Sequence, residues 1–174
     1  MKQLTLFLFL SFYITSCNSQ TTKNEYENKI QEQGEKMAKS LIENDFNSFS
    51  NYTHPKIIEM IGGKEQLVKT LEKGMKEMRS EGIEFISITI GNPSQIYKIE
   101  SELQCTVPQS IEMKVPDGRI VANSTLIAIS NDNGKNWYFI DTEKKDIQTL
   151  KKIVPNLSEK LVIPPAKKPL FYNN

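Results

Sequence analysis

Few side chains in this sequence could carry acid–base, nucleophilic or metal chemistry. His54 is the only histidine, so any catalytic triad or imidazole-based metal cluster has to include it. No second histidine or cysteine stands at ligand spacing from it, which argues against a zinc or iron site. Pro55 follows directly, and proline is favoured at the start of a helix, so capping or loop bonding is the simpler role for His54. We therefore expect no metal and no cofactor.

The two cysteines, Cys17 and Cys105, stand in different surroundings. Cys105 lies among apolar residues of an expected strand, where a free cysteine usually acts as a small buried hydrophobic residue. A catalytic thiol would need exposure and a low pKa. Cys17 follows a charged start, an apolar run over residues 4–14 and two small residues, a pattern typical of a cleaved export signal. The apolar run is about half of the ~20 residues that a membrane-spanning helix requires.

The tetrapeptide Ile14-Thr15-Ser16-Cys17 resembles the lipobox of bacterial lipoproteins, in which an aliphatic residue and two small residues precede the cysteine that takes a diacylglyceryl group. The resemblance implies a signal peptide over residues 1–16, Cys17 as the acylated first residue, and a lipidated tether over residues 17–24. Two or more acyl chains hold a protein stably on a membrane. We therefore expect a lipid-anchored protein of the bacterial cell envelope, facing the periplasm or the cell surface. The alternative is an ordinary secretory signal followed by an incidental cysteine.

The charge balance argues against a nucleic-acid-binding protein. The chain has 22 basic and 21 acidic residues, and no basic stripe stands out. A nucleic-acid binder needs such a stripe to neutralise phosphates. The length suits a single domain, which we place over residues 25–152.

Helical periodicity dominates the first half of the chain. A long amphipathic helix is predicted from apolar residues at three-and-four spacing, namely Tyr26, Ile30, Met37, Ala38, Leu41 and Ile42. A second amphipathic helix is predicted from Lys64 to about Glu81, followed by Gly82 as its stop. Between them, Thr53-His54-Pro55 looks like the start of a short apolar helix that ends at Gly62-Gly63.

From residue 83 onward, apolar residues recur at every second position, as in β-strands. This pattern predicts an antiparallel sheet of four to five strands. The strands are expected over residues 83–90, 97–107, 111–115, 120–130 and 136–141. In the strand over 97–107 the odd positions are mainly apolar and the even positions polar, so we expect the odd positions to face inward. A short helix over 143–152 and an extended, proline-containing tail over 153–174, packed on the domain, complete the chain. This order predicts an α+β fold with helices on one sheet face.

The element order and one loop resemble the nuclear-transport-factor-2-like superfamily, the cystatin-like cone, over about residues 24–152. The most family-like stretch is DFNSFSNYTHPKIIEMIGGKEQL, residues 45–67, between the two long helices. The resemblance implies a long helix lying across a strongly curved sheet, with a cavity at the wide end. Members of the superfamily include enzymes, carriers and structural modules, so the fold leaves the function open.

Residues 130–137, Ser-Asn-Asp-Asn-Gly-Lys-Asn-Trp, are similar to the Asp-box hairpin of sialidase-type propellers, with Asn136 in place of the usual hydroxyl residue. A propeller would need several copies at a regular period, and the chain has one. Local chemistry accounts for the motif, since an aspartate can accept N–H groups within a turn and glycine permits positive φ. We interpret the motif as a hairpin staple made by Ser130, Asp132, Gly134 and Trp137.

The ketosteroid-isomerase branch of the resembled superfamily implies an enzymatic alternative. That chemistry needs a carboxylate base facing a phenol or neutral acid in an apolar pocket. The residues available for a hydratase- or isomerase-like site are His54, Tyr138 and Asp141. Asp141 precedes an expected helix, where a capping carboxylate is the ordinary explanation.

Our first functional hypothesis is therefore a non-enzymatic domain that binds a small apolar ligand or a protein partner. The expected pocket joins one face of the first helix to the odd positions of the strand over 97–107; its candidate residues are Tyr26, Met37, Leu41, Tyr97, Ile99, Ser101, Leu103 and Cys105. The remaining alternative is a structural module that forms a homodimer through the outer face of the sheet. The polar residues Lys98, Glu100 and Glu102 argue mildly against a large apolar interface there.

Overall fold

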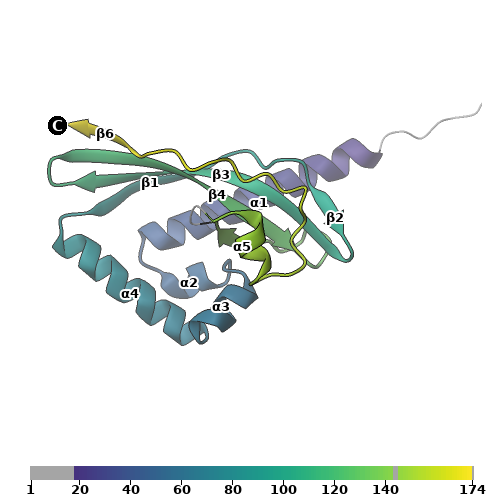
Figure 1. The fold of residues 1–174 in the computed structure, drawn as a ribbon, viewed down its shortest axis with the longest axis horizontal. Coiled ribbons are helices and arrows are strands. Elements are labelled where there is room, and N and C mark those ends of the chain that lie inside the picture. The colour runs from purple at the N-terminus through teal and green to yellow at the C-terminus, as the bar shows by residue number, and fades with distance from the viewer. Residues whose placement is uncertain (1–17, 143–144, 174) are drawn as a thin grey trace, which may run out of the picture.

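The computed structural model describes residues 18–142 and 145–173, with side chains from residue 25 onward. Within these ranges the predicted α+β class is confirmed, since helices pack with an antiparallel sheet that does not close into a barrel (Figure 1). The helices are α1 (Asn18–Ile42), α2 (Phe46–Ser50), α3 (Pro55–Ile61), α4 (Lys64–Ser80) and α5 (Ile147–Lys151). The strands are β1 (Glu84–Ile90), β2 (Tyr97–Ile99), β3 (Glu102–Val115), β4 (Gly118–Ser130), β5 (Tyr138–Asp141) and β6 (Leu170–Asn173).

Local signals set the ends of the short helices. The carboxylate of Asp45 caps α2 by accepting the backbone N–H of Ser48 at 3.0 Å. The Nδ1 atom of His54 caps α3 by accepting the backbone N–H of Lys56 at 3.2 Å. Gly62, at a φ of 100°, ends α3 in the left-handed conformation that glycine favours. Helix α1 begins at Asn18, so it includes residues that we expected to form the polar tether.

The long hairpin β3–β4 is the centre of the sheet and pairs from Leu103↔Ser130 to Val115↔Gly118. Strands β1 and β2 pair with the outer edge of β3, and strands β5 and β6 pair with the outer edge of β4. Over the described residues the sheet therefore has six strands, more than the four to five predicted. Strand β6 was not predicted, β2 was joined to β3 in the expected strand over 97–107, and β3 was divided at residues 108–110.

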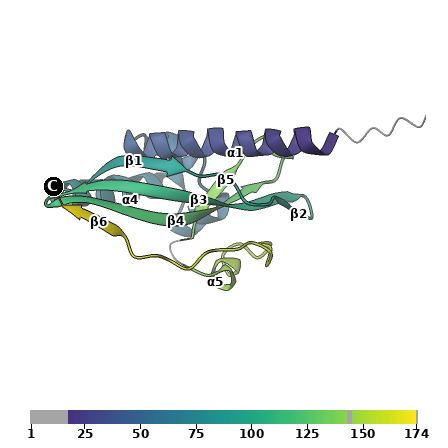
Figure 2. The same cartoon turned by 90° about the horizontal axis from the view of Figure 1, so that it is seen from above.

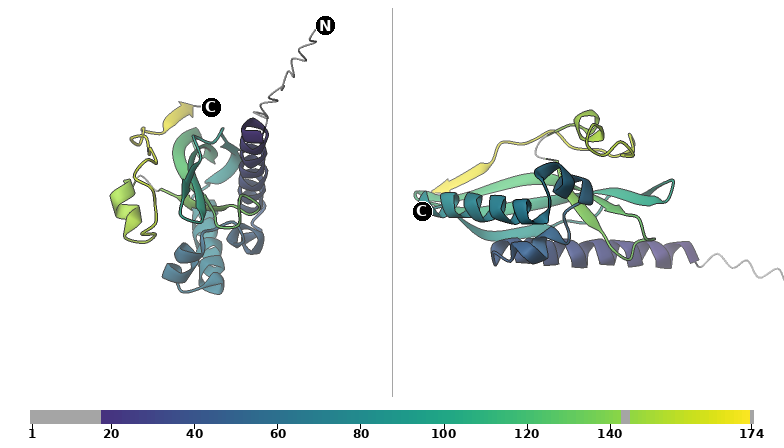
Figure 3. Two further views of the ribbon diagram at one scale, coloured as in Figure 1. Left: turned by 90° about the vertical axis from the view of Figure 1, so that its right-hand side faces the viewer. Right: turned by 90° about the horizontal axis from the view of Figure 1, so that it is seen from below.

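Three layers are visible in Figure 2: α1 lies on one face of the sheet, and α5 with the segment after it lies on the other. We call residues 152–169 the strap, and the two sheet faces the α1 face and the strap face. In the left view of Figure 3, α3 and α4 project below the sheet as a separate arm. Each sheet face has its own hydrophobic cluster.

The cluster on the α1 face packs α1 against the odd-numbered residues of β3; it contains Ile30, Met37, Ala38, Ile90, Leu103, Cys105, Val107, Leu126, Ala128, Trp137 and Phe139. The cluster on the strap face contains Ile127, Ile129, Ile140, Leu150, Val154, Leu157 and Leu161. The apolar part of the strap face is therefore covered by the chain's own C-terminal residues. A homodimer through that face would have to displace them.

The predicted continuous strand over 97–107 is wrong, because the chain turns at Glu100 and Ser101. Glu100 has a φ of 53°, and the two arms pair as Tyr97↔Gln104 and Ile99↔Glu102. Alternation of apolar and polar residues continues through a hairpin just as through a straight strand, and no glycine or proline marks this turn. β3 also runs on to Val115 through the gap expected between 107 and 111.

A fully buried side chain, Gln104, joins the strap to the sheet. Its Nε2 donates to the carbonyl oxygen of Asn156 at 3.1 Å, and its Oε1 accepts the backbone N–H of Ser158 at 3.0 Å. Nε2 also donates to the carboxylate of Glu102 at 2.8 Å. The amide therefore provides both a donor and an acceptor to a backbone segment that forms neither helix nor strand.

Replacing Gln104 by leucine is expected to lower the free energy of unfolding by about 2 kcal/mol, because the Asn156 carbonyl and the Ser158 N–H lose their buried partner. The same replacement at the exposed Gln95 is the matched control, with an expected change near zero. Urea unfolding gives both values, and proteolysis of the native protein should become faster within the strap in Gln104→Leu only. Equal proteolysis of the two variants would show that Gln104 does not hold the strap.

Candidate functional site

A largely apolar cavity of about 470 Å³ lies between the helical arm and the sheet. Its apolar lining comes from α1–α4, β1, β3–β5, α5 and the start of the strap, and consists of Met37, Ala38, Leu41, Phe49, Ile57, Met60, Ile61, Leu67, Leu71, Ile88, Ile111, Leu126, Phe139, Ile140, Leu150 and Ile153. Its volume and composition lie within the range of small-molecule sites.

The cavity exists because the arm does not close on the sheet. Helix α3 has no fully buried residue, and α4 buries only Leu67 and Met75. Met60 of α3 lines the cavity while 60% of its surface is exposed. Apolar side chains that would normally pack against each other therefore surround open space, which an apolar molecule could occupy.

A polar group stands at the sheet side of the cavity. Gln109 of β3 lines it and is buried, and its Nε2 donates to Asp141 Oδ2 at 2.8 Å and to Ser124 Oγ at 2.7 Å. These two bonds fix the amide orientation and leave its carbonyl oxygen as the acceptor. That oxygen can accept a hydrogen bond from a molecule in the cavity. Other polar side chains at the cavity are Thr53, Thr70, Asp141 and Lys145.

The structure places two of the eight predicted pocket residues, Met37 and Leu41, at this cavity. Tyr26, Leu103 and Cys105 instead pack in or against the solid cluster on the α1 face. These three share the expected face, but Trp137 and its neighbours fill the space there.

The other three predicted pocket residues lie elsewhere. Tyr97 and Ile99 pair opposite Gln104 and Glu102, so they share the strap face, and Tyr97 packs against the strap-face cluster. Ser101 is exposed in the turn before β3. The odd-numbered side chains therefore face α1 in the first half of β3, as expected. Before the turn, those of Tyr97 and Ile99 face the strap instead.

Sequence reasoning missed the lining from the arm, such as Ile57, Ile61 and Leu71, and the far half of β3. The short apolar run over 57–61 was visible in the sequence. Its role was not, because an apolar stripe on a helix looks the same whether it faces a packed core or a cavity.

Cys105 does not have the properties of a nucleophile. Its side chain is completely buried, and this burial, together with the nearby charge of Glu27, raises the pKa of the thiol to about 12. The thiolate, which is the reactive form, is therefore absent at neutral pH.

The residues of the enzymatic alternative are not brought into one site. Tyr138 pairs with Ile129 and Asp141 pairs with Leu126, so their side chains leave β5 on opposite faces. His54 packs edge-on against the Tyr138 ring, with ring centroids 6.4 Å apart, while its Nδ1 caps α3. Burial is the main cause that lowers the pKa of His54 to about 4, and nearby Lys56 adds to it, so the imidazole is neutral.

The hairpin at residues 130–137 is tightly bonded to itself and to α1. Asp132 accepts from Ser130 Oγ, from the Asn136 N–H and from Asn136 Nδ2, at 2.9, 2.9 and 2.6 Å. Asn136, the departure from the resembled motif, therefore supplies a second bond to the carboxylate. Trp137 Nε1 donates to the Gly134 carbonyl at 3.0 Å, and its backbone N–H donates to Gln33 of α1 at 2.8 Å.

Residues 1–17, which carry the predicted signal peptide and the acylation site Cys17, lie outside the described residues. Over the residues described, no helix is both long and apolar enough to cross a membrane. In the same part of the chain, no cluster of three or more histidine, cysteine or acidic side chains is arranged to hold a metal ion. No protein-family model matches the chain, and no curated protein matches it either.

Proposed function

We propose that this protein is a lipid-anchored component of the bacterial cell envelope whose domain binds a small apolar ligand in the cavity between the arm and the sheet. The observation that carries the proposal is the 470 Å³ cavity with apolar walls and one buried amide, Gln109, at its sheet side. Such a site would select a molecule that is mostly hydrocarbon and has one hydrogen-bond donor.

The finer description of the fold belongs to the same proposal. We infer that the domain is a cystatin-like cone of the nuclear-transport-factor-2-like type. Helix α1 lying along one face of an open antiparallel sheet supports this assignment, as does a cavity between helices and sheet.

The anchor rests on the lipobox-like residues Ile14-Thr15-Ser16-Cys17. Intact-mass measurement on the chain purified from bacterial membranes tests it directly. We expect loss of residues 1–16 and a gain of acyl groups on Cys17, both abolished in Cys17→Ser. A mature protein that begins after residue 16 without acyl groups would instead support the ordinary secretory signal.

Ligand binding is tested by native mass spectrometry on the whole chain, released from detergent in the instrument. We expect one co-purified apolar molecule per chain, with a mass that matches neither the detergent nor the N-terminal acyl groups. Binding of several copies, or of detergent alone, would contradict a defined cavity ligand.

Replacing Leu71 by tryptophan is expected to reduce the occupancy of that ligand about 10-fold, because a bulky ring fills part of the cavity and overpacking costs about 1–3 kcal/mol. The matched control is Glu72→Trp, which places the same side chain on the next, exposed residue of α4. Native mass spectra of the two variants give the occupancies, and circular dichroism shows whether both are folded. Equal occupancy in the two variants would place the ligand elsewhere.

A further inference from the structure

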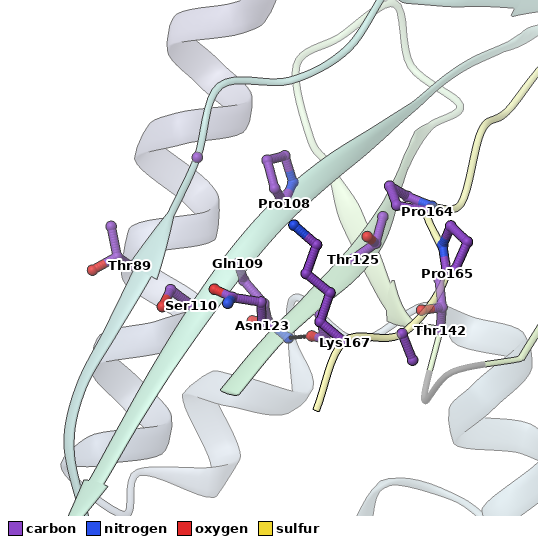
Figure 4. A pocket seen from close by; sticks show the side chains of 13 residues that line it. Thr89, Pro108, Gln109, Ser110, Asn123, Thr125, Thr142, Pro164, Pro165 and Lys167 are labelled. Carbon is purple, nitrogen blue, oxygen red and sulfur yellow. Dashed lines mark hydrogen bonds between the residues drawn. The ribbon is translucent and has the colours of Figure 1, made fainter. Parts of the chain in front are cut away.

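A second cavity, of about 340 Å³, lies on the opposite side of the sheet, between the strands and the strap (Figure 4). The strap packs tightly on the sheet up to Leu161, where Ile127, Ile129 and Ile140 provide an apolar surface. Beyond that point the exposed surface of the sheet is polar, and residues 164–167 pass over it without filling the space.

The floor of this second cavity is made by two cross-strand rows of side chains. The register places Thr89 opposite Ser110 and Ser110 opposite Asn123, which forms the first row. Pro108 and Thr125 are opposite each other in the second row. Because side chains on one sheet face recur at every second residue, these groups share the strap face.

Thr142 extends the second row, since its N–H donates to the Thr125 carbonyl at 3.1 Å. Thr125 and Thr142 are 8% and 2% exposed, and both line the cavity. Over the described residues, no buried side-chain nitrogen or oxygen lacks a hydrogen-bond partner. Thr125 and Thr142 contribute to the proposal through their position, since hydroxyls that line a cavity can exchange hydrogen bonds with a molecule bound there.

The roof of the cavity is formed by Pro164, Pro165, Ala166 and Lys167. The prolines have no N–H group and so cannot pair with a strand, which keeps this part of the strap off the sheet. Strand β6 secures the far end of the strap, because Leu170 pairs with Val121 of β4. In Figure 4 the Lys167 side chain extends over β3 toward Pro108. Among the described residues that line this cavity, Lys167 is the only one with a charged side chain.

We propose that this cavity binds a small sugar acid, a ring with several hydroxyls and one carboxylate. The threonine, serine and asparagine side chains of the floor exchange hydrogen bonds with hydroxyls. The rings of Pro108, Pro164 and Pro165 provide apolar contact for the C–H faces of a sugar ring. Lys167 provides a charge-assisted bond to the carboxylate. The volume lies at the lower end of the range for ligand sites, which suits a molecule of monosaccharide size.

The test is a titration of the whole chain with D-glucuronate, followed by backbone NMR shifts. D-Glucose, which has the ring without the carboxylate, and acetate, which has the carboxylate without the ring, are titrated in parallel. We expect glucuronate to cause saturable shifts at Ser110, Thr125 and Thr142, with about 10-fold weaker binding of glucose, as expected for the loss of one charge-assisted hydrogen bond. Acetate should cause no saturable shift at these residues.

Two substitutions identify the site. Lys167→Gln should weaken glucuronate binding about 10-fold and bring it near that of glucose, whereas Lys168→Gln, at a neighbouring exposed lysine, should leave it unchanged. Thr125→Val removes one buried hydroxyl at nearly constant shape and should weaken both sugars. The proposal is overturned if glucuronate causes no saturable shift at the three floor residues, if acetate acts as glucuronate does, or if the two lysine variants weaken binding equally.

Discussion

Replacing Trp137 by alanine is expected to lower the free energy of unfolding by about 4 kcal/mol, as for other buried tryptophans. Its side chain is 1% exposed and packs edge-on against Tyr26 of α1, with ring centroids 6.4 Å apart. Removing the ring leaves a cavity between α1 and the β4–β5 hairpin. It also removes the bond from Nε1 to the Gly134 carbonyl. Urea unfolding followed by circular dichroism gives the value, since the variant has no tryptophan to report by fluorescence.

Trp137→Phe separates the two contributions. Phenylalanine keeps an aromatic ring in the cluster but cannot donate to Gly134, so we expect a smaller loss of about 1–2 kcal/mol. A loss of unfolding free energy below about 1 kcal/mol in Trp137→Ala would contradict this prediction. The tryptophan would then not be a main contact between the hairpin and α1.

Acidification from pH 6.5 to pH 4 is expected to remove about 3 kcal/mol of stability through His54 alone. Burial lowers the pKa of His54 from 6.5 to about 4 in the folded chain, and the residue is 8% exposed. Between these two values the unfolded chain binds a proton that the folded chain does not, so the unfolded state is favoured as the pH falls. The contribution is fully present above pH 6.5 and is lost by about pH 4.

Between pH 6.5 and pH 5 the expected change in unfolding free energy comes from His54, which is the only histidine. Carboxylates such as Asp45 and Asp146 have a pKa lowered by hydrogen bonds from Ser48 and Thr149, and their contribution is lost only as the pH falls below the ordinary value of 3.8. Urea unfolding at several pH values between 6.5 and 5 therefore reports on the imidazole.

His54→Asn is the matched control, because asparagine also caps helices but does not titrate. We expect its stability to be nearly independent of pH between 6.5 and 5, whereas the natural protein becomes less stable. Identical pH profiles for the two proteins would mean that His54 is not the titrating group.

Several features could be predicted from local sequence because they depend on near neighbours in the chain. The α+β class followed from the change of apolar period near residue 83, and α4 starts at Lys64 as expected and ends at Ser80. His54 was expected either to cap a helix or to bond within a loop, and it caps α3 through Nδ1. These features depend on backbone geometry and side-chain chemistry within a few residues, which the order of residues specifies.

A pocket between the first helix and the sheet was predicted, but most of its lining and the whole of the second cavity could not be, since each depends on segments far apart in the chain. The apolar cavity forms because the α3–α4 arm stands away from a sheet whose strands come later in the sequence. The turn at Glu100 reverses the face of Tyr97 without changing the alternation of residues. Strand β6 pairs with β4 from Val121 to Gly118, and a side chain at Gly118 would overlap the Tyr172 carbonyl. Periodicity in the sequence therefore determined which helices and strands form. Only tertiary packing decided which of their faces meet and where space remains. The reason is that periodicity identifies an apolar face but not what packs against it.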